Sequence, residues 1–257
     1  MTMSYRMGLL LFPKITQLDL AGPYEAFSRV PGATVYLVWK DTQPIRSEWG
    51  LELRPDTRFE ECPALDVLCV PGGPGIFDLL GDDVVVDAIR AIARRSRFVA
   101  SVCTGAFLLG AAGLLAGRRA TTHWASRELL GEFGAIPDEG RIVVDGNLIT
   151  TGGITAGIDF GLHIAAQLVG DEEAKEIQLA MEYDPAPPFT SGSPKVAEPA
   201  IVARFRERIR ERQEMRAALV REAARRLGAR VRVVGKDYAA PSRSMIQRAQ
   251  ANRRSSS

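Results

Sequence analysis

The chain has 257 residues, of which 46% are hydrophobic and 25% are charged, a composition typical of a globular protein with a core of its own. Residues 1–200 carry 17 Lys and Arg against 26 Asp and Glu, whereas residues 201–257 carry 16 against 5, so an acidic body precedes a basic tail. Three cysteines at no metal-ligand spacing argue against a disulfide framework and predict free thiols in a cytoplasmic protein.

Patterns typical of strands alternate with patterns typical of helices along most of the chain. We predict strands over residues 7–13, 33–39, 65–70 and 97–102, a hairpin over 141–151, and helices over 20–30, 82–96, 104–117 and 154–170. The first apolar stretch is far too short to span a bilayer, so we expect a buried strand there and no membrane contact. The alternation predicts an α/β fold, a flavodoxin-like sandwich with a mainly parallel sheet and helices on both faces.

The C-terminal part of the chain reads differently. The Pro-, Gly- and Ser-rich residues 182–194 predict a loop that leaves an α/β domain comprising residues 1–198. Residues 199–228 predict a charged helix, and for the basic residues 229–257 we expect low order. Nucleic-acid binding by this tail stays open, but a solvated Arg/Glu helix with a loose end is favoured, because the tail has no aromatic-rich stacking platform.

Three chemically notable segments lie at the ends of predicted strands. They are TQLDLAGP (16–23), PGGPG (71–75) and VCTG (102–105). Ligands of open parallel sheets bind outside the carboxyl ends of the strands. This convergence predicts that the three segments form one functional site.

Cys103 stands between a predicted strand and a predicted helix. A turn at that place lifts a side chain out of the sheet, as in the nucleophile elbow of hydrolases, and the helix N-terminus is expected to lower the pKa of the thiol. The alternative is a buried structural cysteine, which suits Cys69 within its strand and which Cys62 fits only weakly. For Cys103 we favour the nucleophile.

Asp19 and the PGGPG segment are the other candidates. Asp19 is either the N-cap of the following helix or a carboxyl group that faces the thiol, with a raised pKa and a proton to donate. The turn after the strand that ends at residue 70 should leave backbone N–H groups free to point into the site. The amide of Gly73, beside Gly72, could then form an oxyanion-type hole with the amide of Thr104.

Only two histidines occur, His123 and His163. His123 is expected near a strand end, and His163 lies within a predicted helix as a satisfied core residue. No Cys–His base pair is therefore evident, and a metal site is improbable without a nearby acidic cluster. The sequence predicts a cysteine site that works with a carboxyl group and without metal.

The chain resembles the PfpI-like, class I glutaminase-like superfamily and, within it, the isocyanide (isonitrile) hydratases. The segments that carry the resemblance are residues 16–23, 65–75, 101–124, 151–160 and 178–189. The resemblance implies Cys103 as nucleophile, Asp19 as acid and base, and Thr104 as support for the site. It also implies that Gly73 and Gly72 hold developing charge, that Ile154 and Thr155 line the substrate pocket, and that the protein is a homodimer without cofactor.

The function implied is that of a hydro-lyase which hydrates an isocyanide to an N-substituted formamide through a covalent thioimidate. Another cysteine activity of the superfamily, that of a glyoxalase, deglycase or peptidase, is an alternative. The Thr104 after the cysteine, where those peptidases have histidine, and Asp rather than Glu at position 19 argue against it. A non-catalytic ligand-sensing module of AraC-type regulators is a further alternative, but the basic tail is too short for a pair of helix-turn-helix motifs.

Overall fold

A computed structural model describes residues 3–234 of the chain, with side chains up to residue 230. The chain divides into a compact unit of residues 1–224 and a second unit from residue 225 onward. Among the described residues, no helix is long and apolar enough to cross a membrane.

A seven-stranded sheet forms the centre of the first unit, in the order β10-β11-β7-β6-β1-β2-β5. Every neighbouring pair is parallel except β10 and β11, which form the predicted antiparallel hairpin. The strands are β1 (Tyr5–Leu10), β2 (Ala33–Trp39), β5 (Thr57–Arg58), β6 (Val67–Val70), β7 (Phe98–Ser101), β10 (Ile142–Asp145) and β11 (Leu148–Thr151). Two small sheets pair β3 (Ile45–Arg46) with β4 (Glu52–Leu53), and β8 (Arg119–Ala120) with β9 (Ile136–Pro137).

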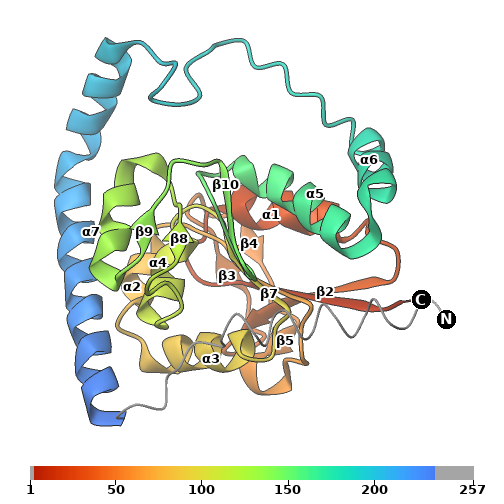
Figure 1. Cartoon of the computed structure of the whole chain (residues 1–257), viewed down its shortest axis with the longest axis horizontal. Coiled ribbons are helices and arrows are strands. Elements are labelled where there is room, and N and C mark those ends of the chain that lie inside the picture. The colour runs from red at the N-terminus through yellow and green to blue at the C-terminus, as the bar shows by residue number, and fades with distance from the viewer. Residues whose placement is uncertain (1–2, 235–257) are drawn as a thin grey trace. The chain divides into compact units, whose positions relative to one another are not determined.

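Helices cover the sheet from both sides. Figure 1 shows α1 and α5 next to each other on one side and α3 on the other. The helices are α1 (Gln17–Phe27), α2 (Gly75–Leu79), α3 (Asp83–Ala93), α4 (Gly105–Ala111), α5 (Ala156–Val169), α6 (Asp171–Ala180) and α7 (Pro199–Val234), with 3₁₀ helices η1 (Phe59–Glu61) and η2 (Trp124–Phe133). The predicted flavodoxin-like α/β sandwich is therefore confirmed.

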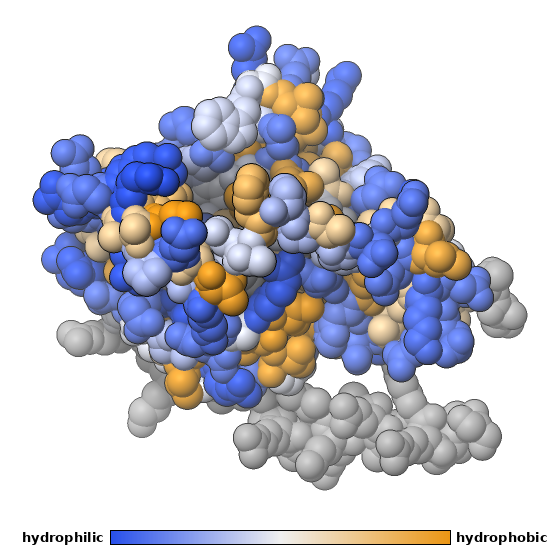
Figure 2. All heavy atoms as spheres, turned by 90° about the horizontal axis from the view of Figure 1, so that it is seen from above, coloured by the Kyte–Doolittle hydropathy of each residue, from blue (hydrophilic) through white to orange (hydrophobic). Residues whose placement is uncertain are grey.

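The central strands are buried because helices pack on both of their faces. All four residues of β6 are buried, as are five of the six in β1, which explains their nearly continuous apolar sequences. The face of the molecule in Figure 2 is mostly hydrophilic, with hydrophobic residues in small separate groups.

Several helix boundaries differ from those predicted, three of them in ways that matter for the site or the tail. α1 begins at Gln17 rather than at residue 20, so Asp19 lies inside its first turn. α4 ends at Ala111 rather than at residue 117, because Gly113 adopts a left-handed conformation (φ 79°) that stops the helix. α7 continues to Val234, past the predicted end at residue 228, and the rest of the predicted tail lies outside the described residues.

The order in which successive strands are added to the sheet reverses at β1, in the middle of the sheet. β1 lies between β2 and β6, so the chain builds outward from β1 in two directions. The carboxyl ends of parallel strands meet at one edge, and such a reversal opens a crevice there. The segments that follow β1, β6, β7 and β11 therefore converge at one place.

The contact between α1 and α5 depends on small residues. A Cβ atom at Gly161 of α5 would lie 2.5 Å from the Cβ of Ala26 and 3.4 Å from the Cα of Pro23, both in α1. Neither atom can rotate away, so the helices can approach this closely only with glycine at position 161. This close packing holds α1, and with it Asp19, against the sheet.

Gly161→Ala should lower the free energy of unfolding by about 1–3 kcal/mol, because the added methyl group forces α1 and α5 apart. Urea denaturation of the purified variant measures the effect. Gly131→Ala in η2 is the control, since a Cβ there meets nothing within 4 Å and the expected change is within about 0.5 kcal/mol. Equal stability of both variants would show that the helices have room to spare.

Candidate active site

The site is assembled from segments that follow four adjacent strands. Asp19 lies in α1 after β1, Gly72 and Gly73 follow β6, Cys103 and Thr104 follow β7, and Gly152 to Ile154 follow β11. In the sheet these strands stand in the order β11-β7-β6-β1. The structure therefore brings together the three segments that the sequence placed at strand ends, and adds a fourth.

Cys103 occupies a sharp turn between β7 and α4. Its φ of 54° lies in the left-handed region, which a residue with a side chain adopts at a cost in energy. The turn is held from both ends of the residue. The Cys103 N–H donates to the Gly152 carbonyl (3.0 Å), and the Thr122 hydroxyl donates to the Cys103 carbonyl (2.6 Å). The expected elbow geometry is thus present.

Gly105, two residues after the cysteine, allows this turn to sit close to the neighbouring strand. A Cβ atom at Gly105 would collide with the backbone carbonyls of Val70 and Pro71. Because backbone atoms cannot be moved aside cheaply, only glycine lets α4 begin directly above the end of β6. Cys103 itself is almost completely buried, with 6% of the residue exposed.

Asp19 is completely buried beside the thiol. Its Oδ2 accepts a hydrogen bond from the Gly72 N–H (2.9 Å), and its carboxyl group interacts with the thiol of Cys103. Its Oδ1 has no hydrogen bond of ordinary geometry within the described residues. The interpretation of Asp19 as a helix N-cap is wrong, because Thr16 occupies the cap position. Its carboxyl group faces the site.

Burial raises the pKa of Asp19 to about 7, and the negative charge of Glu48 acts in the same direction. The hydrogen bond from Gly72 and the interaction with the Cys103 thiol oppose this rise without cancelling it. The carboxyl group is therefore partly protonated at neutral pH. Such a group can both donate and accept a proton under physiological conditions.

Burial also raises the pKa of the Cys103 thiol, and the nearby charge of Asp19 raises it further. The backbone N–H groups of Ile154 and Thr104 lower it, but less. The expectation that the helix N-terminus gives this thiol a lowered pKa is therefore wrong, because burial outweighs the helix. The carboxyl and the thiol instead compete for protons, since a negative charge on one disfavours a negative charge on the other.

The PGGPG turn positions the other groups. The Gly72 N–H donates to Asp19, and the Gly73 N–H donates to the Thr104 hydroxyl oxygen (2.9 Å). The expectation that these amides are free for an oxyanion is therefore wrong: both are already used. The Thr104 hydroxyl in turn lies 3.3 Å from the Gly73 carbonyl, to which it donates. The turn thus fixes Asp19 and Thr104 relative to each other.

Gly72 stands where three site groups meet. A Cβ atom there would lie 2.6 Å from Oδ2 of Asp19, 2.6 Å from the Thr104 nitrogen and 2.8 Å from the Thr104 hydroxyl. Gly73 has a φ of 143°, which also favours glycine. Both positions therefore require glycine, one for space and one for backbone conformation.

Ile154 and Thr155 line a cleft of about 1230 Å³. Ile154 has a φ of 37°, a strained conformation for a β-branched residue, and its N–H is directed to the sulfur of Cys103. The cleft lies between residues 121–128, 139–141, 152–155 and 192–195 and the part of α7 from Ala203 to Ala217. The strained turn at Ile154 is therefore the wall between the thiol and the cleft.

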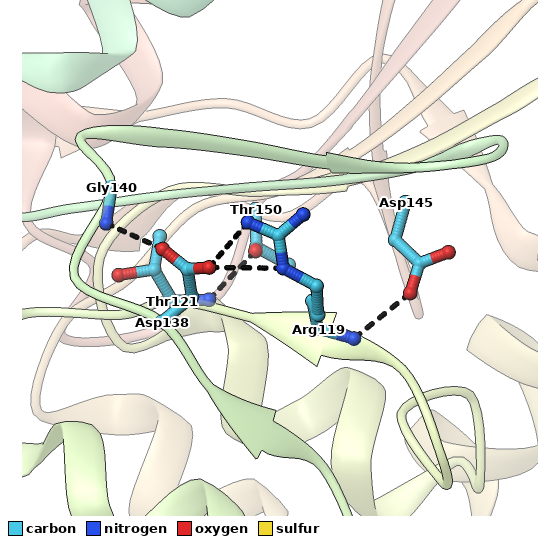
Figure 3. A network of polar contacts seen from close by, with 6 residues as sticks. All are labelled: Arg119, Thr121, Asp138, Gly140, Asp145 and Thr150. Atoms are coloured by element: carbon cyan, nitrogen blue, oxygen red, sulfur yellow. Dashed lines mark hydrogen bonds and ion pairs between the residues drawn. The ribbon is translucent and has the colours of Figure 1, made fainter.

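A polar network holds the segment beneath the cysteine. It joins Arg119, Thr121, Asp138, Gly140, Asp145 and Thr150, which lie in or just after β8, just after β9 and in the β10–β11 hairpin (Figure 3). Arg119 is bound to carboxylates through both its backbone N–H and its side chain, and the Thr121 N–H donates to the Thr150 hydroxyl (2.8 Å). The next residue, Thr122, supports the Cys103 carbonyl. The network thus ties the hairpin to the elbow.

His123 is held as a neutral imidazole. Its Nδ1 accepts from the Ala125 N–H (3.3 Å), where it caps η2. Burial lowers the pKa of His123 to about 4, and the positive charges of Arg216, Arg212 and Arg127 lower it further. Within the described residues, no group of His, Cys, Asp and Glu side chains is placed to hold a metal ion.

The sequence did not predict that α7 packs against the cleft beside the site. Gln213 donates to the Ala125 carbonyl (2.7 Å) and shares a hydrogen bond with Ser126 (3.0 Å), which fixes this turn of α7 next to His123. One turn later, the Arg216 guanidinium lies over the Phe77 ring, 4.7 Å from its centroid. One feature of the sequence could have indicated this packing. Arg216 follows the buried Ile209 by seven residues, which places both on the same face of the helix.

A model of the DJ-1/PfpI family matches residues 6–167. The chain belongs to this family. It is 52% identical over 228 residues to the isonitrile hydratase of Pseudomonas putida, a match that covers 89% of this chain and 100% of the relative. The crystal structure of a THiJ/PfpI family protein from Pseudomonas syringae superposes with a TM-score of 0.83 at 40% identity, over 85% of this chain and 91% of that chain.

Drosophila melanogaster DJ-1beta shares the fold with a TM-score of 0.64 at 24% identity. The match covers 98% of that chain but only 70% of this one. The DJ-1/PfpI family model likewise ends at residue 167, in α5. α6 and α7 therefore lie outside the part of the chain that the family model matches.

Asp19→Asn should make the protein more stable than the wild type at alkaline pH. The folded wild type holds a proton with a pKa of about 7, against 3.8 for the unfolded group, so its free energy of unfolding falls as pH rises through this window, by up to roughly 1.4 kcal/mol per pH unit. The stability difference between variant and wild type should therefore grow from pH 5 to pH 7 and level off above. Urea denaturation at several pH values measures it.

Asp138→Asn serves as the control for this titration. The hydrogen bonds from Gly140 and Arg119 lower the pKa of Asp138, so its carboxylate keeps its charge throughout this range. The effect of the control substitution should therefore be constant from pH 5 to pH 9. A pH-independent effect of Asp19→Asn as well would mean that the Asp19 carboxyl is not held protonated by burial.

Proposed function

We propose that this DJ-1/PfpI protein is an isonitrile hydratase, a hydro-lyase that converts an isocyanide and water into an N-substituted formamide. The observation that carries the proposal is the buried Asp19 carboxyl, with a pKa of about 7, directly against the elbow thiol of Cys103. The 52% identity with the Pseudomonas putida isonitrile hydratase, over that protein's whole length, supports it. A thiol can attack the carbon of an isocyanide, and a carboxyl group with this pKa can donate and accept the proton.

The first step joins the sulfur to the substrate. The terminal carbon of an isocyanide is electrophilic and also accepts a proton. The Cys103 sulfur attacks this carbon, while the proton shared by Cys103 and Asp19 moves to the same carbon. The product is a thioimidate, with a new C–S bond and a new C–H bond, and Asp19 is left as the carboxylate.

The second step adds water. The Asp19 carboxylate takes a proton from a water molecule as its oxygen attacks the thioimidate carbon, and the substrate nitrogen receives this proton. The resulting tetrahedral intermediate loses its hydroxyl proton to Asp19 as the C–S bond breaks. The formamide leaves, and Cys103 and Asp19 again share one proton. Only the elements of water are added, so the reaction needs no redox cofactor.

The remaining site residues have supporting roles in this proposal. Thr104, locked by Gly73, presents its backbone N–H to the sulfur and keeps the turn in place. The Ile154 N–H also stabilises negative charge on the sulfur. Ile154 and Thr155 contact the substituent of the isocyanide at the edge of the cleft. Ile154 and Thr155 are uncharged, which suits a neutral substituent at this edge of a cleft whose other walls carry charged side chains such as Arg141 and Arg206.

We further propose that the chain acts as a homodimer in the cytoplasm. Trp49 and Leu51 are 78% and 51% exposed, and burial of such large apolar side chains against a second copy would stabilise an assembly. All three cysteines are free, as expected of a reducing compartment. Sedimentation of the purified protein tests the dimer.

Cys103→Ala should abolish formation of the N-aryl formamide from a simple aryl isocyanide, because the carbon then has no nucleophile to attack it. Chromatography of the reaction mixture measures the formamide. Cys62→Ser, which removes a thiol outside the site, should retain activity close to that of the wild type. Formamide from the folded Cys103→Ala protein would exclude the covalent route, and no formamide from the wild type would overturn the proposed function.

Asp19→Asn should reduce turnover of the same isocyanide by roughly 10²–10⁴-fold, since an amide can neither donate nor accept the proton at neutral pH. The amide oxygen can still accept the hydrogen bond of Gly72, so the turn keeps its conformation. Initial rates at saturating substrate measure the loss. A reduction of only a few-fold would show that another group moves the proton.

A further inference from the structure

The cleft beside the elbow has room for a large substituent. Its volume is about 1230 Å³, whereas a pocket for a drug-sized ligand measures roughly 300–1,000 Å³. Residues that line it also hold the turn of the nucleophile. The Gly152 carbonyl accepts from the Cys103 N–H, and the Thr122 hydroxyl donates to the Cys103 carbonyl. A substrate that reacts at the sulfur and passes Ile154 therefore has its substituent in the cleft.

One wall of the cleft carries aromatic rings that lead away from the elbow. The His123 ring packs against Gly153, where a Cβ atom would lie 2.6 Å from its Cδ2. The Trp124 ring stacks on the His123 ring, with 5.8 Å between centroids and 28° between planes. Because His123 is neutral, this wall presents two flat, uncharged rings. Such rings bind an aromatic substituent by stacking.

Arg206 of α7 lies at the far end of this wall. Its guanidinium carbon is 5.8 Å from the centroid of the Trp124 ring. Arg206 is exposed, lines the cleft and, among the residues that the structure describes, forms no ion pair with a carboxylate. The neighbouring Glu207 is paired with Arg210 instead (3.1 Å). The charge of Arg206 is therefore available to a ligand in the cleft.

Arg127 is a second cation at this end of the cleft. Residues three apart eclipse each other in a 3₁₀ helix, so Arg127 follows Trp124 on the same face of η2. Its side chain is only 16% exposed, its Nη1 lies 3.4 Å from Glu139, and its Nε has no hydrogen-bond partner within the described residues. Glu139 is also paired with Lys195 (2.7 Å), so one carboxylate serves two cations. A largely buried cation with half a partner is a place where a second carboxylate is stabilised.

Four carboxylates line the cleft, and none of them neutralises this end of it. Glu139 and Glu207 are already paired. Glu214 follows Arg206 by eight residues, about 12 Å further along α7. Glu128 is turned about 120° around η2 from the arginine that precedes it. The end of the cleft at the aromatic wall is therefore positively charged.

We propose that this cleft selects the substrate, an isocyanide whose extended aromatic substituent ends in a carboxylate. The rings of His123 and Trp124 bind the substituent, and the guanidinium groups of Arg206 and Arg127 bind the carboxylate. Guanidinium and carboxylate groups form charge-assisted hydrogen bonds, which fix a ligand in one orientation. The isocyanide carbon at the other end is thereby directed past Ile154 to the thiol. The inference rests on the proposed function and adds to it the class of substrate.

The probes are 4′-isocyanobiphenyl-4-carboxylate and its methyl ester, which have similar lengths but differ in charge. Two rings are needed because two contacts of 5.8 Å each separate the His123 ring from the Arg206 guanidinium. In the wild type, kcat/KM should be about tenfold higher for the acid than for the ester, through a lower KM. Arg206→Gln should reduce this preference to about threefold or less, and Arg206→Lys should restore most of it.

Arg208→Gln is the matched control. Arg208 also lies over an aromatic ring, that of Phe205 at 5.2 Å, but it is not among the described residues that line the cleft. The preference for the acid should therefore equal that of the wild type. The corresponding biphenyl isocyanide with an aminomethyl group in place of the carboxylate tests the opposite charge. Equal kcat/KM for acid and ester, or a preference for the amine, would overturn the proposal.

Binding of the formamide products separates this proposal from the proposed function, because it needs no catalysis. Isothermal titration calorimetry compares the Kd of 4′-formamidobiphenyl-4-carboxylate with that of its methyl ester. If the wild type hydrates no isocyanide, the proposed function fails, while tighter binding of the acid that Arg206→Gln abolishes still supports a carboxylate site in the cleft. Equal binding, binding of neither compound, or a preference for the acid that survives Arg206→Gln would contradict that site.

Discussion

The buried contact between the Asp19 carboxyl and the Cys103 thiol is the constraint on which the rest of the site depends. Two acidic groups in one apolar place cannot both lose their protons at low cost. The surrounding residues either supply hydrogen bonds to one of them or keep water away. The PGGPG turn, the strained turn at Ile154 and the close packing of α1 all serve this contact, although they come from distant parts of the sequence.

Most of the fold could be predicted from the sequence because its signals are local. Apolar runs of strand length alternate with helical patterns, and the prediction of a doubly covered parallel sheet followed directly. The convergence of Asp19, Gly72 and Cys103 could also be predicted, since the carboxyl ends of parallel strands must meet. Both predictions require only that consecutive strands are parallel, which the alternation of strands and helices indicates.

The errors have a common physical origin. Hydrogen bonds of Gly72 and Gly73 depend on side chains that lie far away in the sequence, so their use could not be seen from the turn itself. The pKa of Cys103 depends on burial, which the strand pattern does not quantify. The place of Arg216 depends on where α7 packs after a long irregular segment, and no local pattern determines that path. Tertiary context decided each of these features.

Gly72 has a consequence for how proteins with this fold diverge. Its missing side chain leaves just enough room for Asp19 and Thr104 to meet. A single mutation to any larger residue would displace both groups and leave the strands and helices in place. If these groups carry out the proposed reaction, catalysis can be lost in one evolutionary step without loss of the scaffold, and the crevice that remains is free to acquire a ligand-binding role.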